Sequence, residues 1–240
     1  MAQQISEMVR GNPLQIDRSV HMRRIIDAVG PDVIKYIDDF IRSPLAAADA
    51  PLGWITTLVE AGAGESTITF PDAVGGALLI TSDANEDDGV CLQLDGESFQ
   101  MSTAAALVYF RIKFKCSEAT QSDFFVGLGI TDTTPLGGLT DGVYFQKDDG
   151  AATFKATTEK DSTETNTAAV GTLVADTNIT LEFVYEGGRV EFFVNGVSVA
   201  KHTANIPDDE ALTPTIQFLA GSTVAKTMQI DEVVAIQVGR

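Results

Sequence analysis

The stretch LEFVYEGGRVEFFVNGVSVA, residues 181–200, decides the fold. Apolar and polar residues alternate along it, and two turn signals, Gly187-Gly188 and Asn195-Gly196, interrupt the alternation. Asn-Gly is a strong signal for a two-residue hairpin turn, because both central residues of a type I′ turn have positive φ. The stretch therefore predicts three short antiparallel strands joined by two tight turns.

The two turns determine which residues face one another. A two-residue loop at 187–188 places Glu186 opposite Arg189 and Phe183 opposite Phe192, and a loop at 195–196 places Phe192 opposite Val199. Side chains alternate between the two faces of a strand, so one face of the meander is apolar. The predicted core face holds Leu181, Phe183, Tyr185, Val190, Phe192, Val194, Val197 and Val199.

The opposite face carries the glutamates of this stretch. Glu182, Glu186 and Glu191 lie on it, with the apolar residues Val184 and Phe193 among them. Glycoside hydrolysis needs two carboxylates facing a cleft. In a chain this rich in acid, a solvated outer face explains the glutamates better, and we predict that they are exposed.

From Trp54 onward the whole chain has the same character. Short apolar runs alternate with turns rich in Gly, Asn and Asp, and no helical pattern intervenes. Many short strands at near-regular spacing indicate an all-β sandwich or barrel. About 190 residues favour a two-sheet antiparallel jelly roll, and we predict this domain over residues 54–240.

Residues 1–44 predict a helical N-terminal arm, and residues 45–53 a linker. In PDVIKYIDDFIRSP, residues 31–44, apolar side chains recur at helical spacing between two prolines that suit the ends of a helix. A helix of this length is marginal in water and needs a surface to pack on. That surface is a partner, the sandwich itself or a sister copy. The predicted partner-binding residues are Ile25, Ile26, Val33, Ile37, Phe40 and Ile41.

The charge is unevenly distributed along the chain. The net charge is −18, yet residues 1–44 hold six basic and six acidic residues and are neutral, so the predicted β domain carries all of it. Such a surface repels phosphates, and we expect no nucleic-acid partner. No apolar run approaches the roughly 18 residues that span a membrane, and the N-terminus lacks a secretory signal pattern. We expect no membrane partner and synthesis in a cytoplasm.

Calcium is the one candidate cofactor; otherwise we expect none. The turn SDANEDDG, residues 82–89, offers candidate ligands in Asp83, Asn85 and Asp87, at alternate positions. It is not an EF-hand loop, because Gly89 is the seventh residue from Asp83 rather than the sixth. Asp and Asn also recur in turns for backbone reasons alone. Cys91 and Cys116 show no zinc-ligand spacing, and we predict buried free thiols.

Enzyme motifs are missing from the sequence. There is no Gly-x-Ser-x-Gly elbow, no phosphate-binding glycine loop, and no acidic strand motif of the kind found in jelly-roll glucanases. His202 follows Lys201 at a strand end, and we read it as exposed. We predict that the protein is not an enzyme.

Several segments resemble a known family. ITLEFVYEGGRVEFFVNGVSVAKHTANIP, residues 179–207, resembles the central hairpins of concanavalin A-like and laminin G-like jelly rolls, and TMQIDEVVAIQV, residues 227–238, resembles their last strand. GALLITSDANEDDGVCLQL and DGVYFQKDDGAATFKA are similar to segments of such domains in virion proteins of tailed bacteriophages. The resemblance covers about residues 55–238 and carries over no catalytic residue.

The resemblance implies a structural virion protein. We expect a capsid decoration or head-associated protein of a tailed phage, located on the capsid surface and anchored through its arm. Its expected partners are the major capsid protein or other virion proteins, with sister copies in a homo-oligomer. The alternative is a glycan-binding, lectin-like module of a host-recognition or adhesion protein, and a polysaccharide lyase or hydrolase is a third reading.

Overall fold

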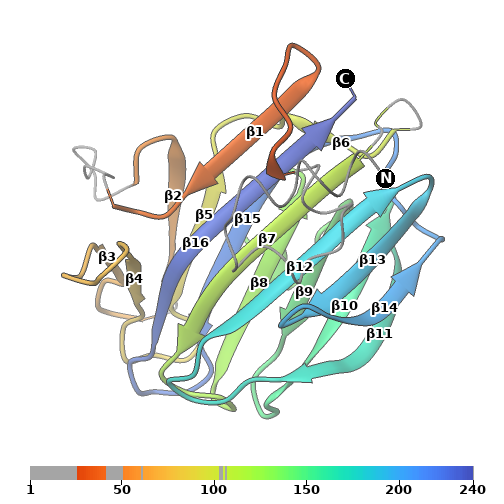
Figure 1. The fold of residues 1–240 in the computed structure, drawn as a ribbon. Coiled ribbons are helices and arrows are strands. Elements are labelled where there is room, and N and C mark those ends of the chain that lie inside the picture. The colour runs from red at the N-terminus through yellow and green to blue at the C-terminus, as the bar shows by residue number, and fades with distance from the viewer. Residues whose placement is uncertain (1–25, 42–50, 61, 103–104, 106, 240) are drawn as a thin grey trace.

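Two antiparallel β-sheets pack face to face in the computed structural model, which describes residues 26–41, 51–60, 62–102, 105 and 107–239 (Figure 1). The first sheet has the order β14-β13-β12-β7-β16-β4-β3, with β1 paired to β16. The second has the order β11-β10-β9-β8-β15-β5-β2, with β6 paired to β15. The predicted two-sheet jelly-roll sandwich is confirmed.

The strands of each sheet come from distant parts of the chain. The first sheet consists of β1 (Val33–Asp38), β3 (Thr67–Thr69), β4 (Leu78–Thr81), β7 (Leu107–Cys116), β12 (Ile179–Glu186), β13 (Arg189–Val194), β14 (Val197–His202) and β16 (Thr227–Val238). The second consists of β2 (Trp54–Val59), β5 (Gly89–Leu94), β6 (Phe99–Gln100), β8 (Ser122–Gly129), β9 (Gly142–Lys147), β10 (Thr153–Lys160), β11 (Thr163–Thr172) and β15 (Ala211–Ala220). A 3-10 turn, Pro135–Gly137, lies between β8 and β9. Within the described ranges, no helix is long and apolar enough to cross a membrane.

Aromatic rings fill the space between the sheets. Phe110 and Phe183 stack within the first sheet, with ring centroids 5.3 Å apart. Phe192 meets Phe145 of the second sheet edge-on at 5.3 Å. All four rings are fully buried, and each contributes about 1.5–3 kcal/mol by leaving water. Both cysteines are buried free thiols, as predicted.

The hairpin register of residues 181–194 is the predicted one. All pairs across the first turn agree, from Leu181 opposite Val194 to Glu186 opposite Arg189. In the second turn, Asn195 and Gly196 have φ of 50° and 78°, the positive values that a type I′ turn requires. The sequence alone therefore predicted both turns.

A β-bulge in β14 changes the register beyond the second turn. Phe192 pairs with Ala200, so the predicted pairing with Val199 is wrong. The extra residue reverses the faces of the residues after it. His202 consequently points into the sandwich and is 4% exposed, against the prediction of an exposed residue. Val197, predicted in the core, is 65% exposed because it lies at the turn of the outermost strand.

The outer face of the first sheet is more apolar than the sequence indicated. Tyr109, Val184, Val234 and Ile236 form a buried cluster on it, and partly buried Phe193 packs against this cluster. Glu182, predicted to be exposed, is 2% exposed and accepts a 2.6 Å hydrogen bond from the Tyr109 hydroxyl. The guanidinium of Arg111, on the neighbouring strand, also lies 4.0 Å from the Glu182 carboxylate.

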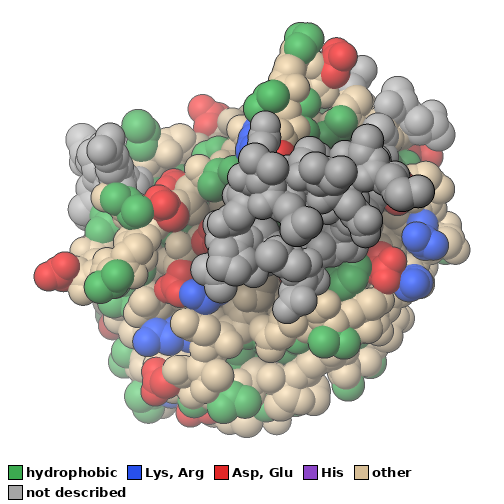
Figure 2. Space-filling model, in the orientation of Figure 1, with side chains coloured by type: hydrophobic (Ala, Val, Ile, Leu, Met, Phe, Trp, Pro, Cys, Tyr) green, Lys and Arg blue, Asp and Glu red, His purple; other side chains and the backbone are tan. Residues whose placement is uncertain are grey.

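Charge on the face seen in Figure 2 is dispersed. Acidic and basic side chains lie around the periphery of its described part and do not gather into a single patch. The large acidic excess therefore does not create one uniform acidic surface on this side of the described chain.

Part of the predicted helical arm is a strand. Val33–Asp38 forms β1, antiparallel to β16, with Val33 opposite Val238 and Asp38 opposite Val233. The segment VIKYI is rich in β-branched residues, which suit a strand, and the edge of β16 supplies backbone partners that a lone helix lacks. The helix predicted across these residues is wrong. Residues 1–25 of the predicted arm and 42–50, which include most of the linker, lie outside the described residues.

Candidate functional site

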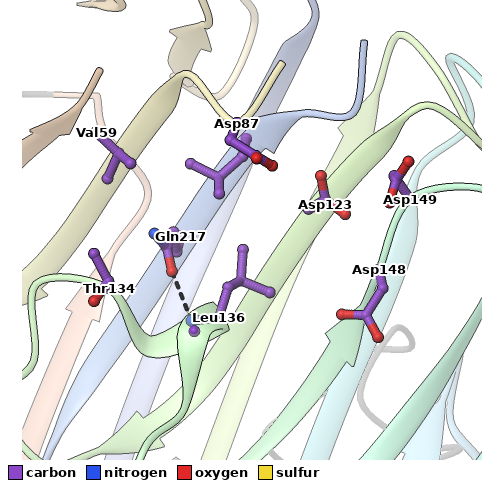
Figure 3. Close-up of a pocket in the computed structure, with 10 residues that line it drawn as sticks. Val59, Asp87, Asp123, Thr134, Leu136, Asp148, Asp149 and Gln217 are labelled. Carbon is purple, nitrogen blue, oxygen red and sulfur yellow. Dashed lines mark hydrogen bonds between the residues drawn. The ribbon is translucent and has the colours of Figure 1, made fainter. Parts of the chain in front are cut away.

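A cavity of about 370 Å³ opens on the outer face of the second sheet (Figure 3). We call it the acidic pocket, because four of its ten lining residues are aspartates. It is lined by Val59, Asp87, Asp123, Thr134, Leu136, Gly137, Asp148, Asp149, Gln217 and Leu219. Its size lies within the range of small-molecule binding sites, about 300–1,000 Å³.

The floor of the acidic pocket follows the strand register. Asp123 on β8 points outward, because side chains alternate along a strand and its neighbour Phe124 lies in the core. Leu219 on β15 pairs with Asp123 and also with Gly89 on β5, which in turn pairs with Val59 on β2. Asp123, Leu219 and Val59 therefore lie in line across neighbouring strands, and together they form the floor of the pocket.

The loop between β8 and β9 forms one wall. Side-chain amides of the sheet hold its backbone: Gln217 accepts a 2.8 Å hydrogen bond from the Leu136 N–H, and Gln93 accepts one of 3.0 Å from the Asp132 N–H. Gln93 also donates to the Ile130 carbonyl at 3.1 Å. Both glutamines are buried, so the wall is fixed before any ligand arrives.

Two turns place the remaining aspartates at the rim. Asp87 adopts a positive φ of 65°, and its N–H donates to the Ala220 carbonyl at 2.8 Å. On the other side, the turn that carries Asp149 packs closely on Gly221. A Cβ at position 221 would lie 2.4 Å from the Cβ of Asp149, so only glycine permits this approach. Asp87, Asp148 and Asp149 are exposed at the rim, whereas Asp123 lies deep.

Asp123 is the unusual group of the site. It is 8% exposed, and among the described residues its Oδ2 atom has no hydrogen-bond partner. Burial raises the pKa of this carboxyl to about 6, and the carboxylates of Asp149 and Asp87 add to the rise. The backbone N–H of Asp149 and the charge of Lys147 oppose it. A buried acceptor without a partner at a cavity is typical of a binding site.

A second group of acidic side chains lies on the outer face of the second sheet, and it leaves no room for a ligand between its carboxylates. The Tyr144 hydroxyl donates to Glu159 at 2.6 Å and lies 3.4 Å from Glu164, which also pairs with Lys155. Burial raises the pKa of Glu159. Tyr144 and Glu159 are only 2% and 5% exposed, so a sugar ring cannot reach between the two carboxylates. The group is a hydrogen-bonded network that joins three strands.

The candidate calcium ligands are divided between two places. The Asn85 side-chain amide donates to Asp83 at 2.8 Å and to Asp88 at 3.0 Å, so it acts there as a donor rather than as a metal ligand. Asp87 lies instead at the acidic pocket. Across the described residues, no group of three or more His, Cys, Asp or Glu side chains is placed to hold a metal ion. Calcium at this turn remains a prediction.

The predicted partner-binding residues do not share one helical face. Ile25 lies outside the described residues. Ile26 and Val33 are partly buried against the apolar cluster on the outer face of the first sheet. Phe40 is buried in the main core, whereas Ile37 and Ile41 are 51% and 60% exposed. Among the described residues of this set, only Ile37 and Ile41 therefore present a largely exposed side chain.

The family of the chain follows from a sequence-family comparison. Residues 72–236, which include every residue of the acidic pocket except Val59, match the model described as SO2946-like, C-terminal domain. The chain belongs to this family. No curated protein matches this SO2946-like domain.

Solved structures with this fold have diverse functions. A Shewanella oneidensis MR-1 protein of unknown function, SO2946, shares 13% identity over 95% of each chain, with a TM-score of 0.57. The CBM2 module of the evolved Dit of Lactobacillus casei BL23 phage J-1 shares 13% identity over 87% of this chain and 97% of that chain, with a TM-score of 0.56. SCLam, a non-specific endo-beta-1,3(4)-glucanase of family GH16, shares 13% identity over 88% and 93%, with a TM-score of 0.58. These likenesses support the concanavalin-like fold.

Sequence reasoning missed the acidic pocket of this SO2946-like domain. A signal was present at Asp123, the one charged residue in the strand SDFFVGLG, in which every residue is buried. A charge in a fully buried strand needs a partner or a function. The contributions of Gln217 and Asp149 could not be inferred from the sequence, because they depend on which strands and turns become neighbours.

Proposed function

We propose that this SO2946-like domain is a carbohydrate-binding module that binds a glycan in the acidic pocket. The pocket combines apolar walls with a few convergent polar groups, the usual composition of a small-molecule site. The kinship of fold with a carbohydrate-binding module of a phage Dit agrees with the proposal, although fold alone does not determine function.

The proposal rests on Asp123, whose Oδ2 atom is buried without a hydrogen-bond partner among the described residues. A buried carboxylate oxygen without a partner is costly for a folded protein, by about 1–3 kcal/mol. A ligand that donates a hydrogen bond to it removes that cost, and the hydroxyl and amino groups of a sugar are such donors. The glutamine-bound loop keeps the pocket open for this ligand.

We infer binding without catalysis. The same fold serves hydrolases, but the acidic strand motif of jelly-roll glucanases is absent from this sequence. Glu159 is buried and accepts its hydrogen bond from Tyr144, so it cannot flank a glycosidic bond together with the exposed Glu164. Incubation with common polysaccharides should release no reducing ends, and measurable release would overturn this part of the proposal.

A glycan array tests the binding proposal directly. The full chain should bind a defined set of glycans, and Asp123→Asn should weaken that binding. Asp95→Asn is the matched control, since it removes the same charge from an exposed turn outside the pocket. Equal binding by the chain and by Asp123→Asn would place the glycan elsewhere, and a blank array would refute glycan binding.

A second proposal concerns the setting in which the module acts. We propose a tailed-phage virion, with the domain on the capsid surface as a decoration or head-associated protein, in contact with the major capsid protein and with sister copies. The fold shared with a phage Dit module and the strongly acidic composition support it. Deletion of residues 1–25 leaves β1 intact and should abolish cosedimentation with phage heads. Full occupancy by the truncated chain would contradict anchoring through those residues.

A further inference from the structure

The acidic pocket combines the charge of a cation-binding site with aliphatic walls. We propose that it selects glycans that carry a free, protonated amino group, such as de-N-acetylated hexosamines, over neutral and acidic glycans. This inference rests on the proposed glycan-binding function and adds the chemical class of the ligand.

The charge of the pocket is not neutralised from within. Its lining contains four aspartates and neither lysine nor arginine. Lys147, the cation whose charge acts on Asp123, is 1% exposed and donates to the carbonyls of Thr120 and Ser122. Its ammonium is therefore committed to the backbone rather than to the pocket. An anionic sugar entering here would meet like charge along the side of the pocket that carries Asp87, Asp123, Asp148 and Asp149 (Figure 3).

An ammonium group matches the acceptor that the pocket offers. Asp123 Oδ2 lies buried without a partner among the described residues. An ammonium brings three N–H donors and a compensating charge, and charge-assisted hydrogen bonds are about twice as strong as neutral ones. A hydroxyl would satisfy the oxygen but would leave the like charges of Asp87 and Asp149 uncompensated.

The apolar lining favours an organic cation over a metal ion. Calcium takes six to eight oxygen ligands at short distances, and no cluster of acidic side chains within the described chain is placed to provide them. Val59, Leu136 and Leu219 instead present carbon surfaces beside the carboxylates. A sugar ring with an amino substituent places its C–H groups against these walls and its nitrogen at Asp123.

Calorimetric titration of the full chain at pH 6.5 with four hexasaccharides tests the ligand class. The ligands are a glucosamine oligomer, its N-acetylated counterpart, cellohexaose and an oligogalacturonate. We expect the glucosamine oligomer to bind at least about tenfold more tightly than the N-acetylated one, since removing a hydrogen bond to a charged group costs about that factor or more. Asp123→Asn and Asp149→Asn should each abolish the preference, and Asp95→Asn should keep it.

The outcomes separate the inference from the proposed function. Tight binding of neutral oligomers that is lost in Asp123→Asn would uphold glycan binding in the pocket and refute selection of an amine. A thermal shift with calcium chloride alone that Asp123→Asn abolishes would assign the pocket to a metal ion and also refute it. Failure to bind any of the four, together with a blank glycan array, would refute both proposals. A melting temperature of Asp123→Asn at or above that of the parent chain shows that the variant is folded.

Discussion

His202 in the first sheet and Thr158 in the second are joined by a hydrogen bond, with 3.1 Å between Nδ1 and Oγ1. The Thr158 hydroxyl donates to the Ala204 carbonyl at 2.9 Å, so it accepts from the imidazole and Nδ1 carries the proton. Nε2 is then the acceptor for the Thr167 hydroxyl at 2.9 Å. Burial lowers the pKa of His202 and so favours this neutral form of the ring, which connects the two sheets at their edge.

We predict that stability falls as His202 becomes protonated. Burial lowers the pKa of His202 in the folded state, so its contribution is complete above the unfolded pKa of about 6.5 and is lost as the pH falls toward the folded value. Urea unfolding between pH 8 and pH 5 should show a slope of up to about 1.4 kcal/mol per pH unit from this group. His202→Asn should lack this component, and an identical slope in parent and variant would contradict the assignment.

The fold was predictable where local signals decide it. The turns at 187–188 and 195–196 fix the register, because their backbone requirements are local. The bulge that buries His202 was not predictable, since no turn residue marks it and the partners of His202, Thr158 and Thr167, lie on the opposite sheet. The helix predicted over Val33–Asp38 was wrong because a distant strand decides the outcome: the apolar spacing fits a helix, but the edge of β16 offers backbone partners.

Asp123→Asn should stabilise the protein at neutral pH. The folded pKa of about 6 lies above the unfolded value of about 3.9, so the carboxyl favours the folded state below the unfolded value, and this contribution is lost as the pH rises through 6. We expect Asp123→Asn to raise the free energy of unfolding by about 1–3 kcal/mol at pH 7.5, with the gain vanishing below pH 4.

Asp95→Asn provides the comparison for this measurement, because its side chain is exposed. Its effect should stay within about 0.5 kcal/mol, as for most surface substitutions. A loss of stability in Asp123→Asn at pH 7.5 would mean that the buried carboxylate has a stabilising partner, and it would remove the main argument for a ligand.

The site was less predictable than the fold. The sequence singled out Asp83, Asn85 and Asp87 by their spacing, yet Asp87 lines the acidic pocket, whereas Asp83 accepts a hydrogen bond from the Asn85 amide. Spacing along a loop does not determine which way each side chain points. Asp148 and Asp149 line the same pocket as Asp87 only because β8 and β15 pair and bring the ends of distant strands together.

Lys147→Met should destabilise the domain strongly. Lys147 is 1% exposed and donates to the backbone carbonyls of Thr120, Ser122 and Asp148. Methionine keeps much of the volume but leaves buried acceptors without donors, at about 1–3 kcal/mol each. We expect a loss of about 2–4 kcal/mol in urea unfolding.

Lys201→Met provides the comparison. The ammonium of Lys201 is exposed and pairs with Glu191 at 3.2 Å, so this substitution should cost less than about 1 kcal/mol. Equal losses would show that the carbonyl contacts of Lys147 carry no special weight.

Gln217→Leu should loosen the wall of the acidic pocket while the sandwich stays folded. The substitution removes the acceptor of the Leu136 N–H, and the change should cost about 1–2 kcal/mol of stability. Hydrogen exchange should quicken in residues 131–138 and remain unchanged in β12 and β13, since the loop loses one of its attachments to the sheet. Glycan affinity should fall because the wall is no longer fixed in advance.

Gln146→Leu is the matched control for the exchange measurement. The Gln146 side chain bonds only Asp148, at 2.8 Å, in the described chain, so the loop should keep its protection from exchange. Unchanged exchange in the loop of Gln217→Leu would show that other contacts hold the wall in place.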